Sequence, residues 1–301
     1  MKYYLGFDIG GSFIKYAVGN PGELPIMQDK IPTPTASIEG FIHTFHQLIG
    51  RLLKEYGSKD LQGIGIATPG TIDRKSGLLK GVNPNLPWWV DIDPRIVVPP
   101  EYRKIALCDN DANLMALAEA SGKKGMVLGI TVGTGIGSGY VIDGAIYHGS
   151  KGFALELGHT KVVADGAICN CGLKGCVEAY SSVTAIRKYA AGIDAKYQEL
   201  ELSGIIKAQA KDAVLKKGIR QAEKYLALAL ANVAMILDPD SIVLGGGAMD
   251  GGLYDLARIR RHFRANTQKS YHHIQILPAR YGNLAGVMGA IGLASLAMND
   301  E

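Results

Sequence analysis

The segment that most constrains the fold is residues 156–178, ELGHTKVVADGAICNCGLKGCVE, because it carries three of the chain's four cysteines. These are Cys169, Cys171 and Cys176, and His159 lies ten positions before the first of them. Thiolate and imidazole groups at such short spacings bind Zn²⁺ as a tetrahedral Cys₃His set. The alternative is a group of buried or disulfide-bonded cysteines. Three cysteines cannot all pair with one another, however, and a chain of this size seldom depends on disulfides. We therefore predict a structural zinc site with four protein ligands.

Two carboxylates flank the predicted metal site. Glu156 lies just before the histidine, and Glu178 lies just after the last cysteine. A bound metal ion would hold the loop in one conformation, and the two carboxylates with it. Carboxylates accept several hydrogen bonds, which suits the adjacent hydroxyl groups of a sugar. The segment therefore predicts a binding site for a polyhydroxyl ligand.

Composition excludes several classes of protein. The 301 residues, 47% of them hydrophobic, are enough for two domains with buried cores. The formal net charge of +4 is small and no cluster of Lys and Arg stands out, so we expect no nucleic-acid partner. No apolar run approaches the roughly 20 residues that cross a bilayer, and no signal peptide is recognised, so we expect no membrane partner. The few cysteines favour a reducing compartment, and we predict a cytoplasmic protein.

A glycine turn lies close to the N-terminus. Residues 3–18 predict two strands joined by a turn at Gly10–Ser12. Paired glycines let backbone amides point at an anion because no Cβ atom interferes. Asp8, at the end of the first strand, is a candidate to hold a hydrated Mg²⁺, and Lys15 is a further charged candidate. Taken alone, the motif fits a plain hairpin as well as a phosphate-binding loop.

The glycine-turn pattern recurs later in the chain. LGFDIGG at residues 5–11 resembles LGITVGT at residues 128–134, and a second strand is expected after each copy. Two such turns at the ends of two sheets would bind a triphosphate from both sides. The alternative is that they are two unrelated hairpins. A third glycine turn, Gly245–Gly247, follows a buried strand, and its bare backbone would admit a flat adenine ring.

Asn110 and Asp111 are predicted at a strand-to-helix junction, since a strand-like run ends at Cys108 and helical periodicity covers about 112–121. One interpretation is that either residue caps the helix. The other is that a rigidly held carboxylate near the helix N-terminus orients a ligand hydroxyl.

The segment before this junction, KGVNPNLPWWVDID, predicts a surface loop on which Trp88 and Trp89 are partly packed. Asn85 in this loop is a candidate for the edge of a ligand pocket. Helical periodicity also covers residues 37–56, 179–191, 211–237 (interrupted only by Gly218), 254–266 and 284–298.

Taken together, these motifs resemble the ROK family of sugar kinases, within the actin-like ATPase fold. DIGGS, ATPGTID, NDANLMALAE, GTGIGSG, ELGH, CNCGLKGCVE and IVLGGG follow in the family's order along nearly the whole chain. The departures are Ser12, where Thr is usual, and Leu155, where a small residue is common. The resemblance implies a two-lobed α/β fold of the ribonuclease H-like kind with a zinc-binding loop. We expect a small domain of residues 1–116 plus a C-terminal helix at 284–301, and a large domain of residues 117–283 with the zinc loop.

The resemblance also implies roles for individual residues. Asp111 would be the general base toward a sugar hydroxyl, and His159 would serve both zinc and substrate. The candidate sugar-binding residues are Asn85, Asn110, Asp111, Glu156, His159 and Glu178. The candidate residues around the nucleotide and its Mg²⁺ are Asp8, Gly10, Gly11, Ser12, Lys15, Gly133, Thr134, Gly135, Gly245, Gly246 and Gly247.

The implied activity is phosphorylation of a hexose hydroxyl by ATP, with Mg²⁺ and a structural Zn²⁺ as cofactors. Glucose, giving glucose 6-phosphate, is the first candidate because the ELGH pattern resembles the family's glucokinases. The family's fructokinases tend to carry His-Pro-Glu before Gly-His. N-acetylmannosamine, N-acetylglucosamine, mannose, fructose and β-glucosides stay open as substrates, as does polyphosphate in place of ATP.

Two non-kinase functions are alternatives. A sugar-sensing ROK regulator would carry a winged helix-turn-helix ahead of the first glycine turn, and we expect none here because Asp8 lies so near the first residue. An actin-like ATPase used in assembly would not need the zinc loop or the NDAN motif. From the resemblance we also expect a homodimer or homotetramer.

Overall fold

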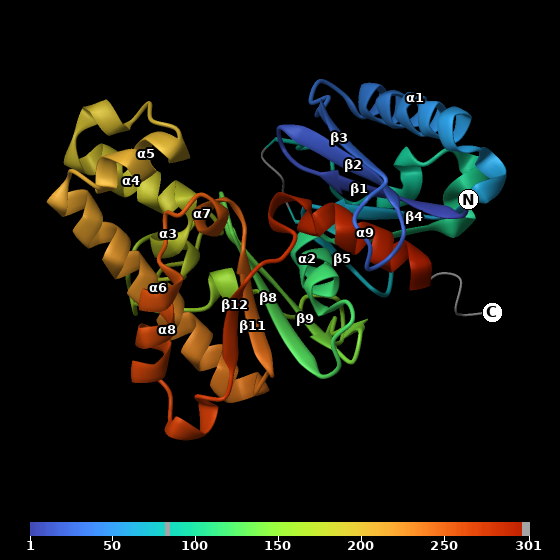
Figure 1. The fold of residues 1–301 in the computed structure, drawn as a ribbon. Coiled ribbons are helices and arrows are strands. Elements are labelled where there is room, and N and C mark those ends of the chain that lie inside the picture. Colours follow the sequence, from blue (N-terminus) through green and yellow to red (C-terminus); the bar gives the residue numbers. More distant parts are fainter. Residues whose placement is uncertain (82–84, 297–301) are drawn as a thin grey trace. The chain divides into compact units, whose positions relative to one another are not determined.

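The computed structural model describes residues 1–81 and 85–296, and the chain divides into two compact units (Figure 1). Unit 1 comprises Met1–Lys124, Gly139–Ala154 and Leu284–Glu301, and unit 2 comprises Gly125–Ser138 and Leu155–Asn283. Each contains sheet strands and helices, so the predicted α/β class is confirmed. The units differ from the predicted domains in that residues 117–124 and 139–154 belong with the N-terminal part. The predicted C-terminal segment 297–301 lies outside the described residues.

The sheet of unit 1 has five strands in the order β3-β2-β1-β4-β7. Neighbours among β1, β2 and β3 are antiparallel, and β4 and β7 continue the sheet parallel to β1. A separate two-stranded ribbon joins β5 and β6. The bounds of these strands are β1 Tyr3–Ile9, β2 Phe13–Gly19, β3 Met27–Pro32, β4 Leu61–Thr68, β5 Thr71–Ile72, β6 Leu79–Lys80 and β7 Ala106–Asn110.

One face of this sheet is nearly bare backbone where the helix α9 (Ala285–Leu296) crosses it. Gly6 in β1 and Gly63 and Gly65 in β4 face the helix, and a Cβ atom on Gly65 would lie 1.8 Å from the Ala290 carbonyl oxygen. The helix itself consists of small and apolar residues, AGVMGAIGLASL. Glycines in the strands and small residues in the helix therefore allow the helix backbone to lie closer to the sheet backbone than larger side chains would permit.

The opposite face of the sheet is covered by α1 (Ile38–Tyr56), as Figure 1 shows. The Ser37 hydroxyl accepts a hydrogen bond from Gly40 N and begins the helix, and Gly57 ends it with a left-handed φ of 87°. The ring of Phe45 packs 5.4 Å from that of Phe7 in β1, between ring centroids. The amphipathic pattern of residues 37–56 is thus explained by burial of one helix face on the sheet.

The expectation that both tryptophans are only partly packed is wrong for Trp89, which is wholly buried. Its ring lies 5.1 Å from that of Phe41, and its Nε1–H donates to Thr68 Oγ1 at 2.8 Å. The loop carries Trp89 inward because this hydroxyl satisfies the only polar atom of the indole. Trp88 is half-buried beside it.

The second sheet has the order β10-β9-β8-β11-β12. Strands β8, β11 and β12 are parallel and β10 is antiparallel to β9; the boundary between the units falls within β9, after Ser138. Position by position, this order matches that of the first sheet, with β8 in the place of β1 and β11 in the place of β4. The internal repeat is therefore confirmed in the topology. The bounds are β8 Met126–Val132, β9 Ile136–Ile142, β10 Ala145–Ile146, β11 Ser241–Gly245 and β12 Gln275–Pro278.

The helical segments predicted in unit 2 are found with two differences, and two further helices, α5 and α7, were not predicted. The helix expected at residues 179–191 is interrupted at Ser182, whose extended backbone and hydroxyl cap the second part. Gly218 does not interrupt the long helix; instead it leaves room for the ring of Tyr189, which a Cβ atom would approach to 1.9 Å. The bounds are α3 Glu178–Ser181, α4 Val183–Ile193, α5 Leu202–Gln209, α6 Ala213–Leu237, α7 Gly247–Asp250 and α8 Leu256–Ala265.

Candidate active site and metal centre

The predicted site residues are distributed over both units. Unit 1 holds Asp8, Gly10, Gly11, Ser12, Lys15, Asn85, Asn110 and Asp111. Unit 2 holds Gly133, Thr134, Gly135, Glu156, His159, Cys169, Cys171, Cys176, Glu178, Gly245, Gly246 and Gly247. The geometry of each group follows from the elements of its own unit.

The first glycine turn joins β1 to β2 and is closed by a hydrogen bond from Gly10 N to Phe13 O at 3.0 Å. Asp8 precedes it on β1, and its Oδ2 lies 3.4 Å from Lys15 Nζ. Burial raises the pKa of the Asp8 carboxyl, and the positive charge of Lys15 counteracts part of that rise. A Cβ atom on Gly11 would lie 2.3 Å from the Asn85 side-chain nitrogen, so this amide lies directly against the turn.

Asn110 caps the helix α2 (Asp111–Ala120), as one interpretation of the junction predicted. Its Oδ1 accepts hydrogen bonds from Ala112 N at 2.9 Å and Asn113 N at 3.3 Å, and its Nδ2 donates to Gly70 O at 2.9 Å. Asp111 is the first residue of the helix, and its Oδ1 accepts from Ala112 N at 2.8 Å. The capping side chain and the helix start thus fix the backbone on both sides of Asp111.

Asp111 keeps an exposed side chain, yet the pKa of its carboxyl is raised to about 6. Desolvation by the surrounding protein is the main cause, and the negative charge of Asp8 adds to it. Hydrogen bonds from the backbone and the charge of Lys15 act in the opposite direction. A carboxylate with this pKa is ionised at neutral pH and is a stronger base than an ordinary aspartate.

A buried carboxylate beside this junction was missed by sequence reasoning. Asp109, the residue before Asn110, is almost wholly buried and accepts hydrogen bonds from Asn110 N and Asn113 Nδ2. His148 Nε2 lies 2.6 Å from Asp109 Oδ2, and Arg74 Nη1 lies 3.8 Å from the same oxygen. Nothing in the spacing of these residues along the chain indicates that they meet.

The four residues of the predicted metal centre come together in unit 2. One ligand atom from each of His159, Cys169, Cys171 and Cys176 lies within 4.8 Å of the others. Cys169 Sγ is 3.7 Å from His159 Nδ1, and Cys171 Sγ is 3.7 Å from Cys176 Sγ. Tetrahedral zinc with Zn–S bonds of about 2.3 Å separates its sulfurs by about 3.8 Å, whereas a disulfide joins them at about 2.05 Å. The cluster therefore fits a bound metal ion and not a disulfide.

Glycines shape the loop that carries these ligands. Gly172 adopts φ 84° and its N–H donates to Cys169 O at 2.9 Å, which closes a tight turn around the second cysteine. Gly175 adopts φ 79°, and a Cβ atom there would lie 1.8 Å from Val163 O. Beside the cluster, Lys161 Nζ donates to Cys176 Sγ at 2.9 Å and so places a positive charge next to this sulfur.

Glu178 links the metal loop to the second glycine turn. Its Oε2 accepts a hydrogen bond from Ile136 N at 2.9 Å, and a Cβ atom on Gly135 would lie 2.5 Å from that oxygen. Its Oε1 lies 3.5 Å from Cys169 Sγ. Glu156 is exposed and follows Leu155, which adopts a left-handed φ of 65°.

The other two glycine turns are held by backbone contacts. Gly133 O accepts from Val183 N at 2.8 Å, and Thr134 O accepts from the Thr184 hydroxyl at 2.7 Å. Gly246 adopts φ 88°, and a Cβ atom on it would lie 2.8 to 3.0 Å from the backbone of Val132. The third turn therefore packs against the end of β8, next to the second.

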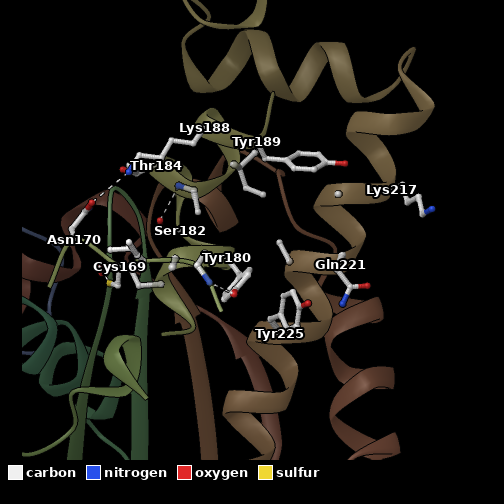
Figure 2. Close-up of a pocket in the computed structure, with 18 of the residues that line it drawn as sticks. Cys169, Asn170, Tyr180, Ser182, Thr184, Lys188, Tyr189, Lys217, Gln221 and Tyr225 are labelled. Carbon is white, nitrogen blue, oxygen red and sulfur yellow. Dashed lines mark hydrogen bonds between the residues drawn. The ribbon is translucent and has the colours of Figure 1, made fainter. Parts of the chain in front are cut away.

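A cavity of about 690 Å³ lies between α4 and α6 of unit 2 (Figure 2). Figure 2 shows Tyr180 and Tyr225 side by side on its wall, with ring centroids 4.7 Å apart. Of the predicted site residues, Cys169 and Glu178 belong to its lining and the glycine turns do not. The cavity is thus distinct from the residues predicted to hold phosphates.

Residues 4–297 match the family model described as the ROK family. This chain belongs to the ROK family. It is 35% identical over 315 residues to a glucokinase of Halalkalibacterium halodurans, covering 96% of this chain and 93% of that protein. It is 31% identical over 307 residues to an N-acetyl-D-glucosamine kinase of Aliivibrio salmonicida, covering 95% and 98% of the two chains.

The fold agrees with this membership. A ROK family glucokinase from Streptomyces griseus, solved in complex with glucose and AMPPNP, superposes with a TM-score of 0.81 at 29% sequence identity, covering 98% of this chain and 99% of that one. The actin-like ATPase fold predicted from the motifs is therefore confirmed. None of the helices within residues 1–81 and 85–296 combines the length and the hydropathy that a membrane crossing requires.

Proposed function

We propose that this protein is an ATP-dependent hexose kinase that converts glucose to glucose 6-phosphate, with Asp111 as the general base. The proposal is supported by the similarity to a glucokinase along 96% of the chain. The single structural observation that carries it is the placement of Asp111. A carboxyl with its pKa raised to about 6 begins a helix whose backbone is fixed by the neighbouring cap.

In the proposed reaction, the ionised Asp111 carboxylate accepts the proton of a sugar hydroxyl. The sugar oxygen forms a bond to the γ-phosphorus of ATP while the bond from that phosphorus to the bridging oxygen of ADP breaks. Because the transition state of phosphoryl transfer is loose, the proton moves late, and alignment matters more than base strength. A rigid carboxylate at a helix start meets this requirement.

The other groups of unit 1 suit the triphosphate. Backbone amides of Gly10–Ser12 can donate to phosphate oxygens because the glycines lack side chains. The Asp8 carboxylate is of the ligand type that binds hydrated Mg²⁺, and the ion would neutralise charge on the transferring phosphoryl group. Lys15, 3.4 Å from Asp8, supplies a further positive charge.

The groups of unit 2 suit a sugar and a metal. His159, Cys169, Cys171 and Cys176 would hold Zn²⁺, whose contribution is to fix the loop. His159 Nδ1 faces Cys169, so the other ring nitrogen, Nε2, is the one suited to a sugar hydroxyl. Glu156 and Glu178 would accept hydrogen bonds from hydroxyl groups, and Gly245–Gly247 would lie near adenosine.

The test is an ADP-release assay over a panel of hexoses with wild type, Asp111→Asn and a matched control, Glu39→Gln. Glu39 is also an acidic residue in the first turn of a helix, and it is exposed on α1. We expect glucose to be phosphorylated, the Asp111 variant to lose about 10² to 10⁴ in kcat, and the control to match wild type. Near-normal turnover of the Asp111 variant would show that another group is the base. Steady ATP hydrolysis without phosphorylation of any sugar would remove the kinase proposal.

A second candidate substrate is N-acetylglucosamine, because the chain is 31% identical to an N-acetyl-D-glucosamine kinase over 95% of its length. The same panel decides between the two sugars by their kcat/KM values. Polyphosphate is tested as donor in place of ATP. The predicted homodimer or homotetramer is checked by light scattering during gel filtration, and the predicted cytoplasmic location by fractionation of cells.

A further inference from the structure

The buried carboxylate of Asp109 has no role in the proposed chemistry, yet it lies next to the residues that carry it. Its side chain is only 4% exposed, and a buried charge is costly unless several donors satisfy it. Asp109 is the second-to-last residue of β7, and Asn110, the last, is the cap of α2. The carboxylate is therefore built into the strand end from which Asp111 projects.

One oxygen of Asp109 holds the backbone before Asp111 and a side chain after it. Oδ1 accepts from Asn110 N, one residue before Asp111, at 2.7 Å. The same Oδ1 accepts from Asn113 Nδ2, two residues after Asp111, at 2.9 Å. A shift of this carboxylate would consequently move the cap and the first helical turn together.

The other oxygen is held by His148. The distance from His148 Nε2 to Asp109 Oδ2 is 2.6 Å, and since a carboxylate only accepts, Nε2 carries the proton in this bond. Arg74, the other basic neighbour of this oxygen, is 3.8 Å away and 45% exposed, which makes it a weak partner. His148 is thus the one short donor to Oδ2 among the described residues.

The segment that carries His148 is itself fixed within unit 1. Ala154 N donates to His148 O at 3.3 Å, and Arg74 N donates to Lys151 O at 3.1 Å. A Cβ atom on Gly152 would lie 2.2 Å from Ile72 O, so this loop packs closely on the strand β5. The imidazole therefore reaches Asp109 from a rigid support and not from a mobile loop.

We propose that His148 is a positioning residue for the catalytic carboxylate: through Asp109 it fixes the start of α2 and hence the direction of Asp111. This inference rests on the proposed function. Without His148, the distant Arg74 is the one partner left to Asp109 Oδ2 within residues 1–81 and 85–296, and the buried carboxylate must turn toward other donors. Its bonds to Asn110 and Asn113 then change, and a misplacement of about 1 Å at a reacting group costs about 10² in rate.

The experiment compares His148→Leu, His148→Gln and the control Tyr147→Leu, which alters the exposed neighbour on the same segment. We expect His148→Leu to lower kcat about 10²-fold with the KM for ATP nearly unchanged. His148→Gln is expected to keep kcat within about tenfold of wild type because its amide can donate to Oδ2. The kcat of Tyr147→Leu should equal that of wild type. Adding Asp109→Asn to His148→Leu should cost no further activity, since the two residues act as a unit.

Hydrogen exchange provides a readout that does not depend on the sugar. In His148→Leu, the amides of Ala112 and Asn113 should exchange faster than in wild type and in the Tyr147 control. Unchanged exchange at these amides, or a kcat of His148→Leu equal to wild type, would overturn the inference. If wild type phosphorylates no sugar, the proposed function fails, and the exchange result alone then decides whether His148 holds the start of α2. If His148→Leu does not fold, His148→Gln decides, because a hundredfold loss of kcat in a folded His148→Gln would also overturn the inference.

Discussion

Replacement of Asp111 by Asn is expected to stabilise the protein at neutral pH while it removes the proposed base. The pKa of the Asp111 carboxyl is raised to about 6 in the folded chain, first by desolvation and then by the charge of Asp8. In the unfolded chain the same group titrates near 3.9. The charged carboxylate is therefore less favourable in the folded protein than in the unfolded one, and an amide of the same shape does not carry this cost.

The size and the sign follow from this difference. Two pKa units correspond to at most about 3 kcal/mol, and because the side chain is exposed, solvent screening reduces this to about 1 kcal/mol. A group whose pKa is raised on folding contributes stability fully at pH values below its unfolded pKa. That contribution is lost as the pH rises through the folded pKa of about 6. Wild type thus loses about 1 kcal/mol relative to the Asn variant between about pH 4 and pH 7.

The measurement is thermal unfolding of wild type, Asp111→Asn and Glu39→Gln at pH 5 and pH 8. We expect Tm of Asp111→Asn to exceed that of wild type by about 2 to 4 °C at pH 8 and by less at pH 5. The Glu39 control should show no such change with pH. An Asn variant that is less stable than wild type at pH 8, or equally stable at both pH values, would refute the desolvation argument. In wild type, kcat/KM should fall as the pH drops through about 6, since the protonated carboxyl cannot accept a proton.

Three further predictions concern the scaffold. Gly65→Ala should lower the free energy of unfolding in urea by about 1 to 3 kcal/mol because its Cβ atom clashes with the α9 backbone. Gly50→Ala, where the added atom meets nothing within 4 Å, should be neutral or stabilising. Cys171→Ser should lose the metal by elemental analysis, and stoichiometric zinc in that variant would contradict the ligand set. Trp89→Phe should cost about 1 to 2 kcal/mol in urea unfolding because the Thr68 hydroxyl loses a buried donor; an unchanged midpoint would show that the bond is dispensable.

Much of the fold could be predicted because the deciding interactions are local. The helix α1 is visible in the sequence from its apolar spacing, its Ser37 cap and the glycine that ends it. The strand β3 was missed because its residues, MQDKIP, are mostly exposed and show no apolar alternation. It exists because its backbone pairs with the edge of β2, which is a contact that only the assembled sheet provides.

The same distinction between local interactions and contacts made only in the assembled fold applies to the site. The cap at Asn110 depends on residues two and three positions away, and the cysteine cluster depends on tight turns within one loop. The bond between His148 and Asp109 joins residues 39 positions apart, and its two partners show no pattern in the sequence. The burial of Trp89 likewise depends on a ring and a hydroxyl supplied by other elements.

The two sheets have the same strand order but differ in the residues at the ends of their equivalent strands. These residues, and not the strand order, determine where a charged group stands. β1 and β8 occupy equivalent positions in sheets of the same order, and each leads into a glycine turn. Asp8 in the first copy corresponds to Thr131 in the second in the repeated pattern, so the carboxylate proposed for Mg²⁺ exists in one copy only. Glu178 in turn contacts the second glycine turn from outside the repeat, through Ile136 N. The repeated strand order thus provides two equivalent turns, which we propose for phosphates, and the residues that differ between the copies place a carboxylate beside one turn only. Asp8→Thr, which makes the first copy resemble the second, should therefore raise the Mg²⁺ concentration needed for half-maximal activity while leaving the sheet folded.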